Sequence, residues 1–128
     1  MTSIVTVHTQ QAARALADDG PYRCPHHTMS LAGLLGSCPR RAALMPAAAY
    51  PGEVSLANGG TLVLDEIHEW LTADLHALAC VFRRGTVYLP SPGSWPGDAI
   101  VIEYPAAPRV VVLVDKVPFY RQNVAIGR

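Results

Sequence analysis

The stretch Gly60-Thr61-Leu62-Val63-Leu64-Asp65-Glu66 decides how this chain folds. A glycine, one threonine, three apolar residues and two acids give a short run without polar alternation, which is typical of a strand buried on both faces. A second run of this kind, Arg109 to Val114, is followed by Asp115. Two buried strands that both end in aspartate predict a parallel sheet with ligand-binding residues at its carboxyl edge.

The flanking segments supply helices and a hairpin. Gln10 to Ala17 is alanine-rich and ends before Gly20-Pro21, so a helix is expected there. Glu66 to Phe82 is predicted as a longer helix, because it carries one apolar stripe at helical spacing: Ile67, Leu71, Leu75, Leu78 and Phe82. Shorter elements are a strand at Ile4 to Val7, a polar loop at Tyr22 to Ser30, helical turns at Leu31 to Leu35 and Glu53 to Ala57, and a loop at Pro39 to Pro51.

Thr86 to Leu89 and Ile100 to Tyr104 predict a β-hairpin whose tip, Pro90 to Gly97, is rich in Pro, Gly and Ser. The order strand, helix, hairpin, strand argues for an α/β fold with parallel strands, flanking helices and a β-hairpin insertion.

Composition limits the function classes. The 128 residues have a formal net charge of zero and only 16% charged residues, so they form no basic field of the kind a free-standing nucleic-acid binder uses. Half of the residues are hydrophobic, which suggests that a partner covers some surface. Three widely spaced cysteines without signal-peptide features favour free thiols and a cytoplasmic location. The longest apolar run, Val110 to Val114, is too short to span a membrane.

Asp65 and Glu66 have the position of the acidic pair in a Walker B motif. Asp65 would hold Mg²⁺, largely through water, because Mg²⁺ keeps several waters and takes few carboxylates. Glu66 would orient or deprotonate the water that attacks the γ-phosphate. The alternative is an aspartate that caps the following helix, with Glu66 as an ordinary acid in its first turn.

The flanks of this strand carry a more specific pattern. Pro21 to Ser30 reads PYRCPHHTMS, Ala32 to Gly36 reads AGLLG, and Pro51 to Gly60 reads PGEVSLANGG directly before the strand. In this order and spacing the segments resemble the magnesium-chelatase-type AAA+ ATPases, and among them the competence-related bacterial branch. The resemblance implies that ATP and Mg²⁺ are the cofactors.

The resemblance extends over nearly the whole chain. Val5 to Thr9 is similar to the stretch after the P-loop helix of that family, Thr86 to Tyr104 to the hairpin before sensor 1, and Val110 to Val114 to the sensor-1 strand. It implies that residues 1–128 form a single partial AAA+ (P-loop NTPase-like) core domain, from the Walker B to the sensor-1 region, with no separate lid domain.

Two departures weaken the implied activity. No G-x-x-x-x-G-K-[ST] loop occurs in residues 1–128, and Asp115-Lys116-Val117-Pro118 stands where the family has its sensor-1 asparagine. A P-loop holds the β- and γ-phosphates, so little or no ATP hydrolysis is expected from this chain alone, and its status as an enzyme stays open. Because the P-loop strand neighbours the sensor-1 strand in the family, Val110 to Val114 is also expected to form an unpaired apolar edge.

Two functions follow. In the first, the chain is an ATPase-derived module, with Asp65 for Mg²⁺ and Glu66 as base, that acts with a P-loop-bearing partner chain. In the second, it is a non-catalytic scaffold that self-associates as a homo-oligomer or binds a full-length relative. The family also implies DNA as a partner, but the basic pairs Arg40-Arg41 and Arg83-Arg84 are short, and solvated charge is the preferred interpretation.

Other clusters of reactive side chains favour structural roles. Cys24, His26, His27 and Cys38 could be read as a zinc set, but no second Cys-x-x-Cys pair supports it. His68 and His76 are eight residues apart, too far for a shared site, and are expected at the surface. Cys80 is expected to be a small buried core residue rather than a nucleophile.

Overall fold

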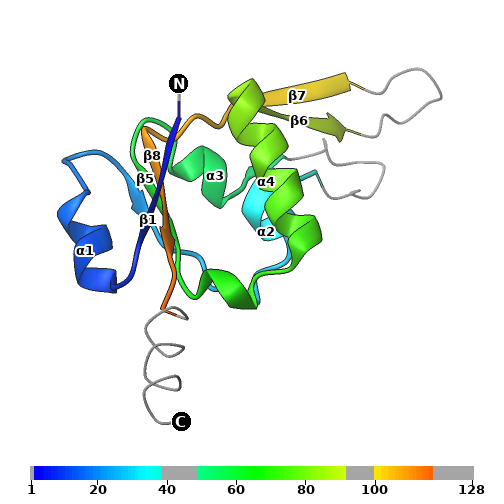
Figure 1. Cartoon of the computed structure of the whole chain (residues 1–128). Coiled ribbons are helices and arrows are strands. Elements are labelled where there is room, and N and C mark those ends of the chain that lie inside the picture. Colours follow the sequence, from blue (N-terminus) through cyan, green and yellow to red (C-terminus); the bar gives the residue numbers. More distant parts are fainter. Residues whose placement is uncertain (1, 39–48, 92–99, 117–128) are drawn as a thin grey trace, which may run out of the picture.

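The computed structural model describes residues 2–38, 49–91 and 100–116, and a four-stranded parallel sheet forms its centre (Figure 1). The strand order is β1 (Ser3–Val7), β8 (Val110–Val114), β5 (Thr61–Leu64) and β2 (Tyr22–Arg23). The register places Val5 and Val63 on either side of Val112. The predicted parallel strands are therefore confirmed, and β2 is an additional short strand inside the predicted polar loop.

The expected unpaired edge at β8 is wrong. β1 pairs with β8 from Ser3–Val110 to Val7–Val114, and β5 pairs with the other edge of β8. A strand that is apolar at every position buries most surface in the middle of a sheet, and Val111, Val112 and Val114 are fully buried there. Within the described residues, the outer edge of the sheet on this side is β1, where 54% of Ile4 is exposed.

Helices cover both faces of the sheet (Figure 1). On one face, α1 (Gln10–Ala15) packs its Ala13 against Val63, Val110, Val112 and Val114. On the other face, Leu62, Leu64 and Val111 share a core with α2 (Leu31–Leu35), α3 (Glu53–Leu56) and α4 (Thr72–Arg84). Every residue of β5 is at most 1% exposed, which confirms a strand buried on both faces.

The helix predicted from Glu66 to Phe82 begins six residues later. Glu66 has a left-handed backbone (φ 50°, ψ 55°), Ile67–Glu69 forms a 3-10 turn (η1), and α4 begins only at Thr72. The break is caused by Trp70, whose ring is buried and whose Nε1 donates a hydrogen bond to the Asp65 carbonyl at 2.8 Å. The turn leaves Leu71 67% exposed, so the predicted apolar stripe is wrong at this position.

Two antiparallel pairs complete the fold. The predicted hairpin is present as β6 (Thr86–Ser91) and β7 (Ile100–Pro105). β3 (Gly36–Ser37) pairs with β4 (Tyr50–Pro51), which the sequence did not predict. Gly36 has φ 106° there, a backbone conformation that favours glycine. Residues 39–48, 92–99 and 117–128, and with them most of the predicted loop and the hairpin tip, lie outside the described residues.

Candidate functional site

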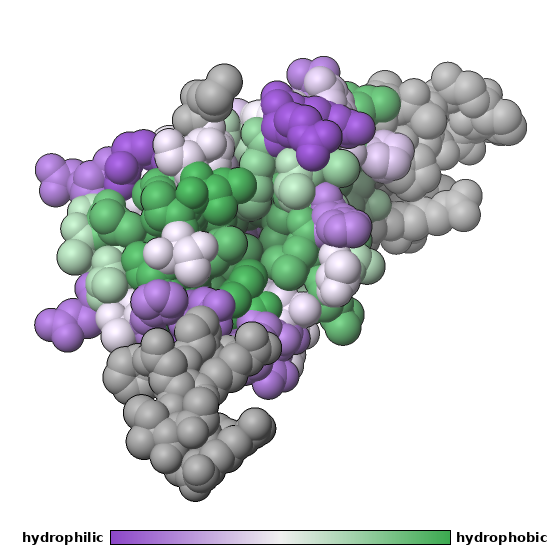
Figure 2. All heavy atoms as spheres, in the orientation of Figure 1, coloured by the Kyte–Doolittle hydropathy of each residue, from purple (hydrophilic) through white to green (hydrophobic). Residues whose placement is uncertain are grey.

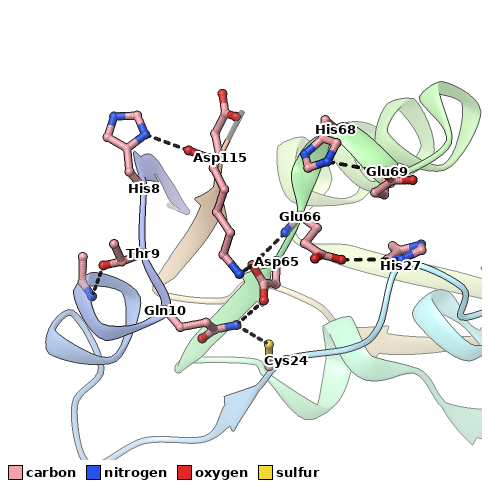
Figure 3. A network of polar contacts seen from close by, with 12 residues as sticks. His8, Thr9, Gln10, Cys24, His27, Asp65, Glu66, His68, Glu69 and Asp115 are labelled. Atoms are coloured by element: carbon pink, nitrogen blue, oxygen red, sulfur yellow. Dashed lines mark hydrogen bonds and ion pairs between the residues drawn. The ribbon is translucent and has the colours of Figure 1, made fainter. Parts of the chain in front are cut away.

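Three segments meet at the carboxyl edge of the sheet. Asp65 follows β5, Lys116 comes shortly after β8, and Gln10 begins α1 just after β1. Because β1, β8 and β5 are parallel neighbours, their carboxyl ends lie side by side. Figure 3 shows the Gln10 side chain and the Glu66 backbone N–H directed at the Asp65 carboxylate, which is the centre of the cluster.

The Asp65 carboxylate has three donors from this chain. Oδ2 accepts a hydrogen bond from Gln10 Nε2 at 2.8 Å, and Oδ1 accepts one from the Glu66 backbone N–H at 2.8 Å. Lys116 Nζ lies 3.4 Å from Oδ1, and the two side chains are 33% and 27% exposed. Burial raises the pKa of Asp65, but the hydrogen bonds from Gln10 and Glu66 and the Lys116 charge outweigh it, so the net pKa is lowered. Asp65 is therefore held as a carboxylate by protein groups alone.

Glu66 points away from this cluster. Its Oε2 lies 3.7 Å from Nε2 of His27, and the side chain is 44% exposed (Figure 3). The left-handed backbone at Glu66 produces this divergence, since it turns the chain sharply after β5. Asp65 is also not the cap of the following helix, because α4 has no side-chain cap and begins well beyond it. The structure thus separates two carboxylates that are adjacent in sequence.

The strand ends beneath the site are tied together. The Asp115 N–H donates to the Val7 carbonyl at 2.8 Å, and His8 Nδ1 contacts the Asp115 carbonyl at 2.8 Å. Thr9 caps α1 by accepting a hydrogen bond from the Ala12 N–H. These bonds fix the backbone on both sides of the position from which Gln10 and Lys116 reach Asp65.

A bidentate ion pair positions the loop that carries His27. Arg23 Nε and Nη2 donate to the two Glu53 carboxylate oxygens at 2.5 and 2.8 Å, and this pairing raises the pKa of Arg23. The pair joins β2 to α3, and the following residues bring the His26 and His27 rings to a centroid distance of 4.2 Å. The loop that carries His27 to within 3.7 Å of Glu66 therefore starts from a strand end that the Arg23–Glu53 pair holds in place.

The donor set does not fit a metal held by this chain alone. In the described part of the chain, no three His, Cys, Asp or Glu side chains are arranged to hold a metal ion. This includes the zinc alternative of Cys24, His26, His27 and Cys38, all of which lie in described segments. The cation that lies beside Asp65 is the Lys116 ammonium group, not a metal ion.

The remaining candidate residues lie away from the cluster. His68 and His76 are exposed, as predicted. The expectation that Cys80 is buried is wrong: its thiol is free and exposed, because Leu78 and Val81 occupy the inward face of α4. Arg83 and Arg84 are exposed in the last turn of α4, and Arg40-Arg41 lies outside the described residues.

Sequence reasoning missed three residues of the site: Gln10, His27 in its contact with Glu66, and Lys116. A signal existed for Lys116, since it is the only lysine of the sequence and follows a fully apolar strand. No such signal existed for Gln10, because nothing in the sequence shows that β1 lies beside β8.

Comparisons with known proteins agree with the pattern of segments. A family model described as magnesium chelatase, subunit ChlI, matches residues 1–119. The uncharacterized protein YifB is 33% identical over 98 residues in both Salmonella typhimurium and Escherichia coli, and the competence protein ComM of Haemophilus influenzae is 31% identical over 98 residues. Each match covers 77% of this chain but only 16–17% of the relative. The chain thus spans about a sixth of the length of these curated relatives.

Among the described residues, no helix is both long enough and apolar enough to cross a bilayer.

Proposed function

The chain belongs to the magnesium chelatase ChlI family, and from this premise we propose that it is one half of an AAA+ nucleotide site that another chain completes. The observation that carries the proposal is the position of Asp65 and Glu66 at the carboxyl end of β5, in the middle of a parallel sheet. Ligands of such sheets bind beyond the carboxyl ends of the strands.

Within the completed site, we assign Asp65 to Mg²⁺ and Glu66 to the base that activates the attacking water. ATP supplies the phosphates, and a loop with backbone N–H groups and a lysine, which residues 1–128 lack, must hold them. Glu66 is suited to its role because its side chain is 44% exposed and its carboxylate lies 3.7 Å from Nε2 of His27. The chain by itself is expected to hydrolyse little or no ATP.

A strand of the partner cannot pair with β8, since β1 and β5 already occupy its two edges. A partner must therefore approach the carboxyl edge, where Asp65 and Glu66 lie, or pair with the outer edge of β1.

The test compares ATP hydrolysis by the chain alone and by its mixture with a P-loop-bearing family member whose own catalytic acid has been removed. No turnover is expected from either protein alone, and turnover is expected from the mixture. Glu66→Gln should abolish that turnover, whereas Glu69→Gln, an exposed acid three residues away, should leave it intact. Turnover by the chain alone that Glu66→Gln abolishes, or a mixture that stays inactive, would contradict the proposal.

A second candidate function, self-association as a non-catalytic scaffold, is favoured by one observation. Among the described residues, β1 pairs on one side only, and apolar surface gathers in the area of β1 (Figure 2). Open edges of apolar strands pair with other chains. If β1 mediates a homo-oligomer, sedimentation at micromolar concentration will show dimers that Ile4→Lys abolishes. Val101→Lys, at a 60% exposed position on β7, is the matched control and should still dimerise. A monomer in all three cases rules this function out.

A further inference from the structure

We propose that Lys116 is the built-in counter-ion of Asp65 and that, in the chain alone, it keeps divalent cations off this carboxylate until a partner completes the site. The inference deepens the proposed function and rests on it for the role of Asp65 as a metal ligand. It starts from the disagreement between a family that implies Mg²⁺ and a site in which an ammonium group stands beside the metal-ligand candidate.

Hydrogen bonding already uses most of the capacity of Asp65. A carboxylate offers about four lone-pair positions. Gln10 takes one at Oδ2, while the Glu66 N–H and the Lys116 ammonium approach Oδ1. Mg²⁺ demands near-octahedral geometry at about 2.0–2.1 Å and keeps several waters around it. A hydrated ion of this size does not fit on Oδ1 while Lys116 Nζ remains 3.4 Å away.

The positive charge of Lys116 also opposes a divalent cation at Asp65. A divalent cation bound to Oδ1 would stand within a few ångströms of a like charge, and both Asp65 and Lys116 are two-thirds or more shielded from water. Partial burial weakens solvent screening, so the repulsion is stronger than between groups at an open surface.

Lys116 follows an interior strand of the sheet whose end is held by hydrogen bonds. It comes two residues after the central strand β8, and the backbone before it is fixed by the Asp115 N–H bond to Val7 and the His8 contact with the Asp115 carbonyl. The ammonium therefore starts from a fixed point beside β5, which carries Asp65 on the neighbouring strand.

The experiment measures Mn²⁺ binding to the purified chain by calorimetry at neutral pH, without nucleotide. Lys116→Met is expected to bind Mn²⁺ about tenfold more tightly than the wild type, because both the competing ammonium and its repulsion are removed. The double variant Lys116→Met/Asp65→Asn should lose this gain. The control variant is Arg84→Met, which also removes one positive charge. Arg84 lies in the last turn of α4, and this end of the helix is beside the segment that precedes β8, so the variant should bind Mn²⁺ like the wild type.

Two results would overturn the inference: wild-type binding as tight as that of Lys116→Met, or tight binding by Lys116→Met that survives Asp65→Asn. Acetylation gives a second route to the same charge removal if the Met variant fails to fold, since Lys116 is the only lysine. Acetylated wild type should gain Mn²⁺ affinity, and Lys116→Gln, treated in the same way, controls for the amino terminus. No arm uses ATP or a partner, so failure of the shared-site proposal and failure of this inference are distinguishable.

Discussion

The left-handed backbone at Glu66 can be tested by comparing the unfolding free energies of Glu66 variants. Glu66 is the one non-glycine residue with positive φ in the described part of the chain, at φ 50°. A left-handed backbone costs a residue with a Cβ about 1–2 kcal/mol, and glycine avoids this cost. Glycine in turn loses about 0.5–1 kcal/mol relative to alanine through the entropy of the unfolded chain.

The difference between these two terms sets the expected result. Glu66→Gly should be more stable than Glu66→Ala by about 0.5–1 kcal/mol. Both variants remove the contact with His27, so its loss cancels in the comparison. The control is Ala73→Gly, at an exposed position of α4, where glycine should instead destabilise by about 1 kcal/mol.

Urea unfolding measures both differences. With an m-value of about 1–3 kcal/mol/M, the two Glu66 variants should differ by about 0.2–1 M in their midpoints. An alanine variant as stable as the glycine variant would refute the left-handed conformation at Glu66, and with it the divergence of the Asp65 and Glu66 side chains.

Three further predictions concern the surroundings of the site. Arg23→Met leaves the 13% exposed Glu53 carboxylate without its bidentate partner and should lower the unfolding free energy by about 1–3 kcal/mol. Arg109→Met, which removes an exposed ion pair with Asp18 and an exposed hydrogen bond to the Leu16 carbonyl, should lower it by at most about 1 kcal/mol in the same urea experiment. The hydrogen bonds from Gln10 and Glu66 and the Lys116 charge hold the pKa of Asp65 in the folded chain below that of an ordinary aspartate, so the folded chain binds fewer protons and its stability rises with pH. This contribution is complete above the unfolded-state pKa and is lost as pH falls through the lower folded-state value. The stability difference between wild type and Asp65→Asn should therefore shrink as the solution is acidified below the ordinary aspartate pKa, and a constant difference would contradict the lowered pKa. The Tyr22 hydroxyl oxygen is buried without a hydrogen-bond partner. Tyr22→Phe should therefore leave the unfolding free energy unchanged or raise it by up to about 1 kcal/mol. A clear loss of stability would show that the hydroxyl is bonded.

Local patterns were sufficient for most elements. The apolar run of β5, the hairpin of β6 and β7, and the end of α4 at Gly85, which has φ 75°, follow from residues a few positions apart. The apolar stripe from Ile67 to Phe82 misled the prediction, because helical spacing cannot show that the Trp70 ring turns inward and bonds to the Asp65 carbonyl. A side chain that finds a buried partner overrides a local preference for helix.

The sequence by itself therefore determined the α/β class, the family resemblance and the place of Asp65 and Glu66 at the end of a buried strand. Only the tertiary structure decided which strand lies beside β8, and through that which side chains reach Asp65. Gln10 is 55 residues from Asp65 in sequence, and Lys116 comes from the neighbouring strand. Such contacts depend on how strands order themselves to bury their edges and faces, which no short window of sequence records.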